Sequence, residues 1–270
     1  LASEESAGQQ VQFKDKNYRI EMPDDFDFSS VEIAFFSAGI EASENYAQQA
    51  ADQGCVVIDN STCFSDEHDV PMVIPEVNPE QLGEFQNRGI IPSPSAETIQ
   101  MLLAVAPLHR HAAVKRINVV TYQSVSGSGR EGVKELAGQT ARLLNAQSPE
   151  TNVYPKQIAF NVLPQSGLLE DNGYAFGEMQ LVRETQKVLA DESVMVNPTC
   201  VRVPVFFGHS EALHVECWDR ISAEEVCEIL SQSAGITLVG DQLDETYATP
   251  VTDAAKNDDV FVSRVRDDIS

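Results

Sequence analysis

Two side chains suited to polar chemistry, Arg202 and His209, lie close together in the sequence. An arginine offers a planar, two-pronged set of donors that suits a carboxylate. A histidine titrates near neutral pH and is the side chain most often used as a general acid or base. A histidine beside a glycine, as His209 is beside Gly208, is by itself more often a surface or packed residue. A functional role therefore depends on what else surrounds the pair.

The cysteines give no sign of a nucleophile, a disulfide or a metal site. They are five in number, an odd count, and they lack CxxC or Cys/His metal spacing. We therefore expect reduced thiols, no disulfide and no metal. Cys63 and Cys200 stand near polar motifs, but buried cysteines usually pack as small apolar side chains.

Charge and hydropathy restrict the partners. The chain has 42 acidic and 18 basic residues, for a net charge of −24, which opposes binding to nucleic acid and to anionic membranes. No run of apolar residues approaches membrane-spanning length, and the first ten residues lack the features of a signal peptide. We expect a cytoplasmic protein without nucleic-acid or membrane partners.

Alternating strand-like and helix-like segments predict an α/β fold. The first part has β-rich runs at residues 31–36, 56–59, 72–74 and 89–91, with helices near residues 41–51 and 97–107. Polar and small residues follow the first two runs: Ser37, Ala38, Gly39 and Asn60. Loops at the carboxyl ends of parallel strands are where such folds bind ligands.

The second part begins with a strand at residues 117–120 and an amphipathic helix at residues 133–144. Period-2 patterns then predict strands at residues 201–207 and 213–217, which we expect to pair as a hairpin through Gly208 and Ser210. The acidic segment at residues 241–259 is most simply a solvated loop.

Several motifs, in the same order over nearly the whole chain, resemble the aspartate-semialdehyde dehydrogenase family. The strings are IPEVNP (residues 74–79), YQSVSGSG (122–129), AFNVLPQ (159–165), NPTCVRVPVFFGHSE (197–211) and RVRDDIS (264–270). The resemblance implies an incomplete Rossmann-like dinucleotide-binding domain at residues 1–97. It also implies a mixed-sheet α/β domain, like that of glyceraldehyde-3-phosphate dehydrogenase, at residues 98–270 that supplies catalysis and dimerisation.

The same resemblance implies a homodimer, NADP as cofactor, and reductive dephosphorylation of aspartyl phosphate through a cysteine-bound acyl intermediate. Arg202 matches the arginine that holds the substrate carboxylate, and His209 matches the acid/base. Gln123 matches the glutamine that orients the substrate, and Glu178 the glutamate that binds its amino group. A small amino-acid-like ligand is the expected occupant.

The nucleophile position departs from the family. Where the family has a loop of the form N-P-N-C-S-T, this chain has Ser93-Pro94-Ser95-Ala96-Glu97-Thr98, so Ala96 takes the place of the cysteine. A methyl group cannot attack a carbonyl. Ser95 is adjacent, but a serine needs a base within hydrogen-bond reach. We therefore expect the family's fold without its full chemistry.

Two further positions expected to hold cations for the phosphate are neutral here, Ser65 and Gln180. Their loss removes charge-assisted contacts to an anion. Because an engineered trap would alter one residue only, the three changes together favour natural divergence. The chain resembles the Usg group, homologues that lack the catalytic cysteine.

The family's opening strand, glycine turn and first helix do not appear before Leu1, nor its last helix after Ser270, so we expect a longer protein. Ser37, Ala38, Gly39, Asn60, Ser126 and Gly127 are the residues expected to line the dinucleotide groove. Three functions stay open: a homologue without acyl transfer that senses ligands or associates with proteins, an oxidoreductase that uses His209 for direct hydride transfer, and a dimeric scaffold.

Overall fold

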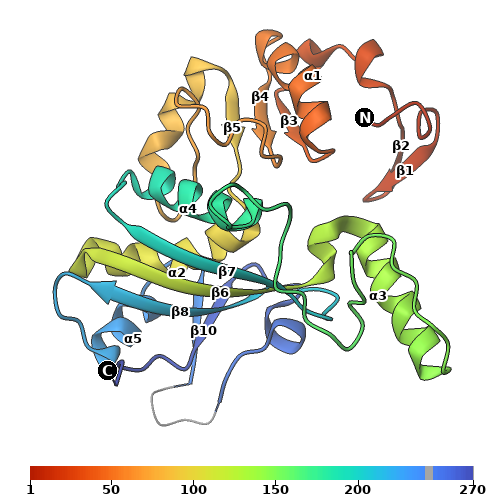
Figure 1. Cartoon of the computed structure of the whole chain (residues 1–270). Coiled ribbons are helices and arrows are strands. Elements are labelled where there is room, and N and C mark those ends of the chain that lie inside the picture. The colour runs from red at the N-terminus through yellow and green to blue at the C-terminus, as the bar shows by residue number, and fades with distance from the viewer. Residues whose placement is uncertain (241–245, 270) are drawn as a thin grey trace. The chain divides into compact units, whose positions relative to one another are not determined.

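A computed structural model describes residues 1–240 and 246–269 of the chain. The chain divides into two compact units, Leu1–Pro94 and Ser95–Ser270, so the division falls three residues before the boundary expected at residue 97. Each unit has its own sheet, and we describe them separately (Figure 1).

The first unit contains a parallel three-stranded sheet in the order β3-β4-β5 and a separate antiparallel pair, β1-β2. Strand β4 forms at the predicted residues, whereas residues 71–74 form no strand. The elements are β1 Gln10–Phe13, β2 Lys16–Arg19, two 3-10 turns at Pro23–Asp25 and Phe28–Ser30, β3 Ile33–Phe36, α1 Ile40–Asp52, β4 Val56–Asp59, a 3-10 segment at Pro79–Asn87, and β5 Ile90–Pro92.

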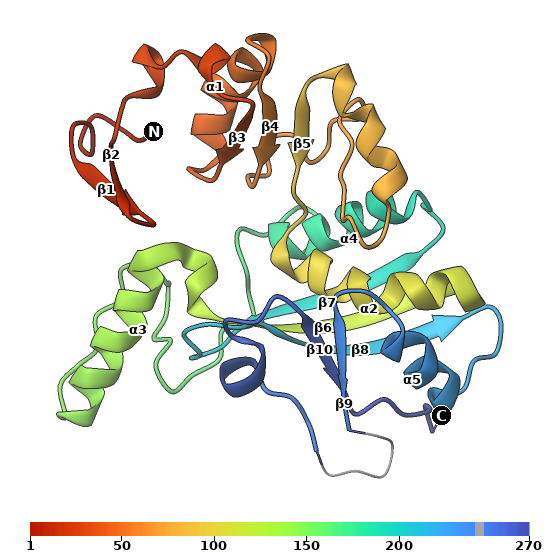
Figure 2. The same ribbon diagram turned by 180° about the vertical axis from the view of Figure 1, so that it is seen from behind.

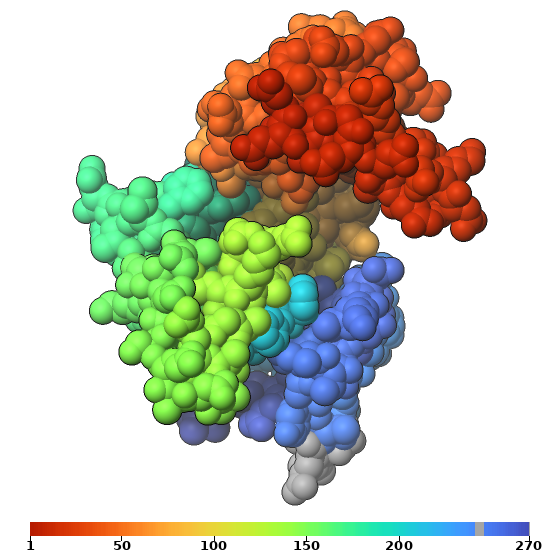
Figure 3. Space-filling model, turned by 90° about the vertical axis from the view of Figure 1, so that its right-hand side faces the viewer, coloured from red at the N-terminus to blue at the C-terminus, as the bar shows by residue number. Residues whose placement is uncertain are grey.

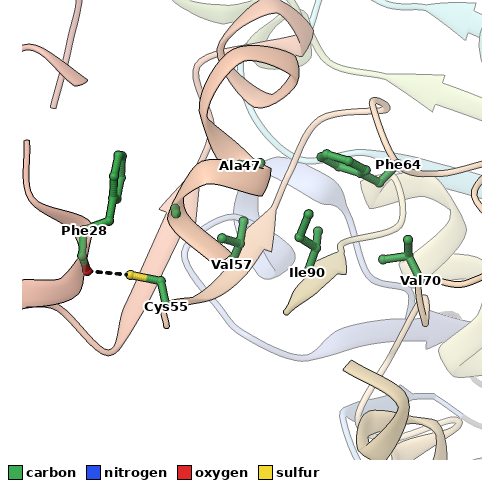
Figure 4. Packing of buried hydrophobic residues seen from close by; sticks show 8 residues of the cluster. Phe28, Ala47, Cys55, Val57, Phe64, Val70 and Ile90 are labelled. Atoms are coloured by element: carbon green, nitrogen blue, oxygen red, sulfur yellow. Dashed lines mark hydrogen bonds between the residues drawn. The ribbon is translucent and has the colours of Figure 1, made fainter. Parts of the chain in front are cut away.

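One apolar cluster holds the first unit together (Figure 4). Val57 from β4 and Ile90 from β5 are fully buried in it, and Ala47 contributes from α1. The Cys55 thiol lies 3.0 Å from the carbonyl oxygen of Phe28 and donates toward it. Because the branched side chains of adjacent strands pack against one helix face, the alternating pattern of the sequence is enough to predict this part of the fold.

The second unit is built on a mixed sheet in the order β7-β6-β8. Strand β7 (Met195–Arg202) pairs parallel with β6 (Val114–Gln123), and β8 (Ser210–Cys217) pairs antiparallel with β6. The hairpin expected between the last two strands is therefore wrong, because β6 lies between them. A period-2 pattern identifies the faces of a strand but not its neighbour, and residues 203–207 are not strand at all.

Helices cover one face of this mixed sheet (Figures 1 and 2). Helix α2 (Ala96–Ala112) contacts β6 and β8, and α4 (Phe176–Leu189) contacts β7. The prediction that α2 ends at Pro107 is wrong. Leu102 and Val105 before the proline and Leu108 after it are buried, and that packing offsets the one backbone bond that a proline removes.

The remaining elements of the second unit are a 3-10 turn at Val125–Ser128, α3 Gly129–Leu144, α5 Ala223–Ser231, a parallel pair of β9 Ile236–Val239 with β10 Val260–Ser263, and a π-helical turn at Pro250–Ala254. Residues 241–245 of the predicted acidic loop lie outside the described residues. Among the helices of the described part, none is long and apolar enough to cross a membrane.

A buried carboxylate fixes the start of α2. Ser95 caps the helix, and its backbone N–H and hydroxyl both donate to Glu184 Oε2, at 2.9 and 2.8 Å. The Thr98 hydroxyl donates to the same oxygen at 2.5 Å, and Gln180 donates to Glu184 Oε1 at 2.7 Å. Because Glu184 is 2% exposed, these donors compensate for the loss of its hydration. The interaction ties α4 to the N-terminal turn of α2.

Replacing Glu184 tests how much its hydrogen bonds to the start of α2 stabilise the fold. We expect Glu184→Ala to lower the free energy of unfolding by about 3 kcal/mol, because four donors lose their buried acceptor. Chemical denaturation of the variant measures the change. Glu228→Ala, at an exposed position of α5, is the control and should change stability by less than about 0.5 kcal/mol. Equal stabilities of the two variants would show that the hydrogen bonds of Glu184 do not stabilise the fold.

Candidate functional site

The ends of three strands bring the predicted catalytic residues together. Gln123 and Arg202 are the last residues of β6 and β7 and face each other in register. His209 directly precedes β8, whose first residue, Ser210, is paired with Tyr122 beside the same end of β6. The parallel and antiparallel neighbours of β6 therefore place Gln123, Arg202 and His209 at one edge of the sheet.

The main chain of Ser124 links the arginine and the histidine. Arg202 Nη1 donates to the Ser124 carbonyl oxygen at 2.8 Å, and the Ser124 N–H donates to His209 Nδ1 at 3.2 Å. The peptide group before Ser124 thus orients the His209 imidazole, and the peptide group after Ser124 orients the Arg202 guanidinium. Since Nδ1 accepts a hydrogen bond from the Ser124 N–H, neutral His209 carries its own proton on Nε2.

The surroundings of His209 favour its neutral form. Burial lowers the pKa of His209, and the positive charge of Arg202 acts in the same direction, whereas Glu97 opposes both. Glu97 Oε1 lies 3.8 Å from His209 Nδ1, and the two side chains are only 17% and 16% exposed. Glu97 lies in the first turn of α2, the helix whose start is held by the hydrogen bonds to Glu184.

A second acidic side chain, Glu211, lies two residues beyond His209 on β8. Neither of its carboxyl oxygens has a hydrogen-bond partner within the described residues. Burial, followed by the charge of Glu97, raises the pKa of Glu211 well above its usual value. The Glu211 carboxyl group therefore binds its proton more tightly than an ordinary glutamic acid does.

Gly127 lies close to both the arginine and the histidine. A Cβ atom at this position would lie 3.2 Å from Arg202 Nη1 and 3.7 Å from His209 Cε1. The neighbouring Ser126 hydroxyl hydrogen-bonds with the Ser124 hydroxyl at 2.9 Å. Figure 3 shows the segment between β7 and β8 at the surface, between α3 and the C-terminal segment. The structure thus places Ser126 and Gly127, predicted as cofactor residues, next to Ser124, Arg202 and His209.

Glu178 and Gln123 already have partners in the unit. Glu178 Oε2 accepts the Ala175 N–H at 2.7 Å and its Oε1 accepts the Cys200 N–H at 2.9 Å. Gln123 Oε1 accepts the Ser166 hydroxyl at 2.9 Å, which directs the amide group of Gln123. Glu178 also lines a pocket of about 450 Å³ that opens between the 164–175 segment and β7. Arg202 and His209 do not line that pocket, so Glu178 is not placed with them.

Position 96, where the family resemblance implies the nucleophile, has no nucleophilic side chain. Ala96 is the exposed first residue of α2. The Ser95 hydroxyl caps the helix and donates to Glu184, as described above. Burial raises the pKa of the Cys200 thiol to about 11, and burial also raises the pKa of Cys63. Both thiols are therefore protonated at neutral pH and are poor nucleophiles.

The other predicted cofactor residues belong to the first unit. Ser37, Ala38 and Gly39 connect the end of β3 to α1, and Gly39, at φ 93°, is the N-cap of that helix. Asn60 follows β4, and its side-chain amide donates to the Ser37 hydroxyl at 3.4 Å. A Cβ atom at Gly39 would meet no atom within 4 Å. These hydroxyl, amide and backbone groups fit the ribose part of a dinucleotide, which offers hydroxyls as partners.

Sequence reasoning missed Glu97, Glu211 and Ser124 as members of this group. Two of them had a usable signal: Glu211 lies only two positions after His209 in the sequence. Glu97 lies beside the altered Ala96. Ser124 acts through its backbone, which no residue type reveals. Within the described residues, no group of three or more His, Cys, Asp or Glu side chains is arranged to hold a metal.

Comparison with known domain families gives two matches. Residues 1–85 match the family described as "Semialdehyde dehydrogenase, NAD binding domain". Residues 105–270 match "Semialdehyde dehydrogenase, dimerisation domain". The two matches agree with the predicted fold class, a dinucleotide-binding domain followed by a mixed-sheet dimerisation domain, which is thereby confirmed.

Individual relatives are also similar along the whole chain. The aspartate-semialdehyde dehydrogenase of Shewanella violacea is 53% identical over 270 residues, which make up 100% of this chain and 79% of that protein. Aspartate-semialdehyde dehydrogenase 2 of Vibrio cholerae is 52% identical over the same shares. A crystal structure of aspartate semialdehyde dehydrogenase II from V. cholerae, complexed with ASA, has a TM-score of 0.96 at 52% identity and covers 99% of this chain and 79% of its own.

The raised pKa of Glu211 predicts a pH dependence of stability. A carboxyl group that binds its proton more tightly in the folded state stabilises the fold below its unfolded pKa of about 4.3 and loses that contribution as the pH rises through its folded pKa. We expect Glu211→Gln to remove this loss, so that its stability advantage over the natural protein grows from pH 5 to pH 8. The advantage amounts to roughly 1.4 kcal/mol for each unit by which the pKa is raised.

Urea denaturation at several pH values measures this difference. Glu216→Gln, at an exposed position of the same strand, provides the matched control. A difference between the natural protein and Glu211→Gln that stays constant with pH would contradict the raised pKa of Glu211.

Proposed function

The chain belongs to the semialdehyde dehydrogenase family, and from this premise we propose that it keeps the family's ligand site but lacks the covalent acyl-transfer step. Ala96 at the nucleophile position carries this proposal. A cysteine thiolate there would form the acyl intermediate, and a methyl group cannot. The protonated state of Cys200 and Cys63 and the engagement of Ser95 in the helix cap support the absence of a substitute.

The altered anion positions support the same proposal. Gln180 stands where a lysine is expected, and its amide donates to Glu184 rather than facing a phosphate as a cation would. Ser65, where an arginine is expected, is also neutral. Without these two charges the acyl phosphate and inorganic phosphate lose charge-assisted contacts. From these positions and Ala96 we propose that the chain belongs to the Usg group.

In this proposal, the residues that bind the ligand and carry the proton in the family keep those roles. Arg202 binds a ligand carboxylate, for which its guanidinium is already oriented by the Ser124 carbonyl. Gln123 offers its amide N–H group to the ligand while Ser166 holds the amide oxygen. His209 presents the Nε2 proton. The ligand is a small amino-acid-like molecule. Glu178 accepts the Ala175 and Cys200 N–H groups and lines a pocket that Arg202 and His209 do not line, so it has no part in this proposal.

NADP is the cofactor that we propose for this site. Ser37, Ala38, Gly39 and Asn60 would hold it in the first unit, and Ser126 and Gly127 belong to the second. The cofactor, when bound, supplies or accepts a hydride. The match to an NAD-binding domain supports this assignment.

A homodimer is the proposed assembly, and cytoplasm the proposed location. The match to a dimerisation domain supports self-association. In the second unit, alternate residues of β6, including Asn118 and Tyr122, turn to the sheet face opposite the buried Ile117 and Val119, and Tyr122 is 41% exposed. A second copy covering this face would bury it.

Two other functions compete with this proposal. Direct hydride transfer on a related aldehyde or amino-acid substrate would use His209 as the acid/base and need no nucleophile. A dimeric scaffold would need no ligand at all. Binding and activity measurements on one sample separate the three.

Restoring the cysteine tests the proposal. We expect the full-length natural protein to bind NADPH with a dissociation constant on the order of micromolar in calorimetry and to show no phosphate-dependent oxidation of aspartate semialdehyde. Ala96→Cys should bind NADPH equally well and raise that oxidation by about 10²-fold or more, since loss of a nucleophile alone costs on the order of 10⁴ to 10⁶ in rate.

The control is Ala96→Ser, which has similar size but lacks the thiolate and should stay inactive. Phosphate-dependent turnover by the natural protein would overturn the proposal. Absence of both NADPH binding and rescue would favour the scaffold.

A further inference from the structure

A buried carboxylate without a role in the proposed function lies at the end of β4. Asp59 is the last residue of this strand, which lies between β3 and β5, and its side chain is 0% exposed. It shares a face of the strand with Val57, two residues earlier, which packs in the apolar cluster of the first unit. Because burial removes the hydration of a carboxylate, Asp59 needs several hydrogen-bond donors.

Ser43 and Ser61 supply these donors. The hydroxyl of Ser43, near the start of α1, donates to Asp59 Oδ1 at 2.7 Å. The Ser61 N–H donates to the same oxygen at 3.1 Å, and the Ser61 hydroxyl donates to Asp59 Oδ2 at 2.7 Å. A carboxylate can accept all three bonds at once, since it has acceptor sites on both oxygens. Asp59 therefore joins the start of α1 to the turn that follows β4.

The residues proposed to hold the dinucleotide lie on the two segments that Asp59 joins. Ser37 and Gly39 directly precede α1, and Asn60 stands between Asp59 and Ser61. The first three of these residues named, Ser37, Gly39 and Asn60, are exposed, whereas Asp59 and Ser61 are buried. The Asn60 side-chain amide donates to the Ser37 hydroxyl at 3.4 Å. The spacing of these two exposed groups therefore depends on the buried hydrogen bonds below them.

The charges of the two segments indicate which part of a dinucleotide they suit. Residues 37–41 and 59–63 contain no lysine or arginine, and they contain the carboxyl groups of Glu41 and Asp59. Negative charges oppose a phosphate, whereas hydroxyl and amide groups pair with ribose hydroxyls. A Cβ atom at Gly39 would meet no atom within 4 Å, so the first segment is open to a ligand there. The segments therefore suit an uncharged ribose better than a phosphate.

We propose that Asp59 is a positioning residue that, through Ser43 and Ser61, sets the spacing of Ser37 and Asn60 for a ribose of the dinucleotide. Asp59 itself does not touch the cofactor, because it is buried below the exposed residues. Segments that are already held in place lose less conformational entropy when a ligand binds, and the affinity is higher for that reason. This inference rests on the proposed function, because it assumes that NADP binds to the first unit.

Calorimetry of the full-length protein with NADPH tests the inference. We expect Asp59→Ala to raise the dissociation constant about tenfold, because the two segments lose their common acceptor. Asp59→Asn keeps an oxygen for the Ser43 hydroxyl and the Ser61 N–H, and its amide can donate to the Ser61 hydroxyl. The dissociation constant of Asp59→Asn should therefore rise by less than about threefold.

The matched control is Val57→Ala, a change on the same face of the same strand. It leaves a cavity in the apolar cluster and lowers stability, but it removes none of the hydrogen bonds of Asp59. Urea denaturation shows how far each variant is destabilised, and Val57→Ala should bind NADPH as the natural protein does. If the dissociation constant rose equally in Val57→Ala and Asp59→Ala, affinity would follow stability alone and the inference would be wrong.

Nuclear magnetic resonance reads the spacing of the segments without any cofactor. The side-chain amide signals of Asn60 should shift in Asp59→Ala and stay in place in Val57→Ala. Unchanged Asn60 signals in Asp59→Ala would contradict the positioning role.

The calorimetry also separates this inference from the proposed function. If the natural protein and Asp59→Ala bind NADPH equally well, the inference is wrong and the proposed cofactor site stands. If the natural protein does not bind NADPH, the proposed cofactor site is wrong, and the inference that depends on it is overturned as well.

Discussion

The pairing of β6 with two neighbours of opposite direction is the constraint on which the site depends. The parallel neighbour β7 ends beside β6 with Arg202 opposite Gln123, and the antiparallel neighbour β8 begins there, directly after His209. Because strand ends are fixed by backbone hydrogen bonds, these side chains are held before any ligand arrives. The peptide groups around Ser124 then orient both Arg202 and His209.

The helix that carries the altered loop is fixed just as firmly. Glu184 satisfies the first donors of α2 from α4, so the turn that contains Ala96 and Glu97 cannot shift without exposing a buried carboxylate. In the function that we propose, side-chain replacement has changed the chemistry of this turn while its hydrogen bonds to Glu184 remain.

The sequence predicted the elements better than their arrangement. Strand β4 and the α/β class followed from apolar patterning, and the family resemblance supplied Arg202, His209 and Gln123. The predicted hairpin of residues 201–217 failed because alternation does not specify which strand lies alongside. Helix α2 continued past Pro107 because tertiary packing outweighs one lost hydrogen bond. Ser124 could not be found, since its contribution comes from the backbone.

The central claim is that no residue of the natural chain forms a covalent acyl intermediate. Intact-protein mass spectrometry tests it most directly, after incubation of the full-length protein with NADP and aspartate semialdehyde without phosphate, so that any acyl group stays attached. The account predicts an unmodified mass for the natural protein and an acyl adduct at residue 96 in Ala96→Cys. An acyl adduct on the natural protein, at Ser95, Cys200 or any other residue, would contradict it.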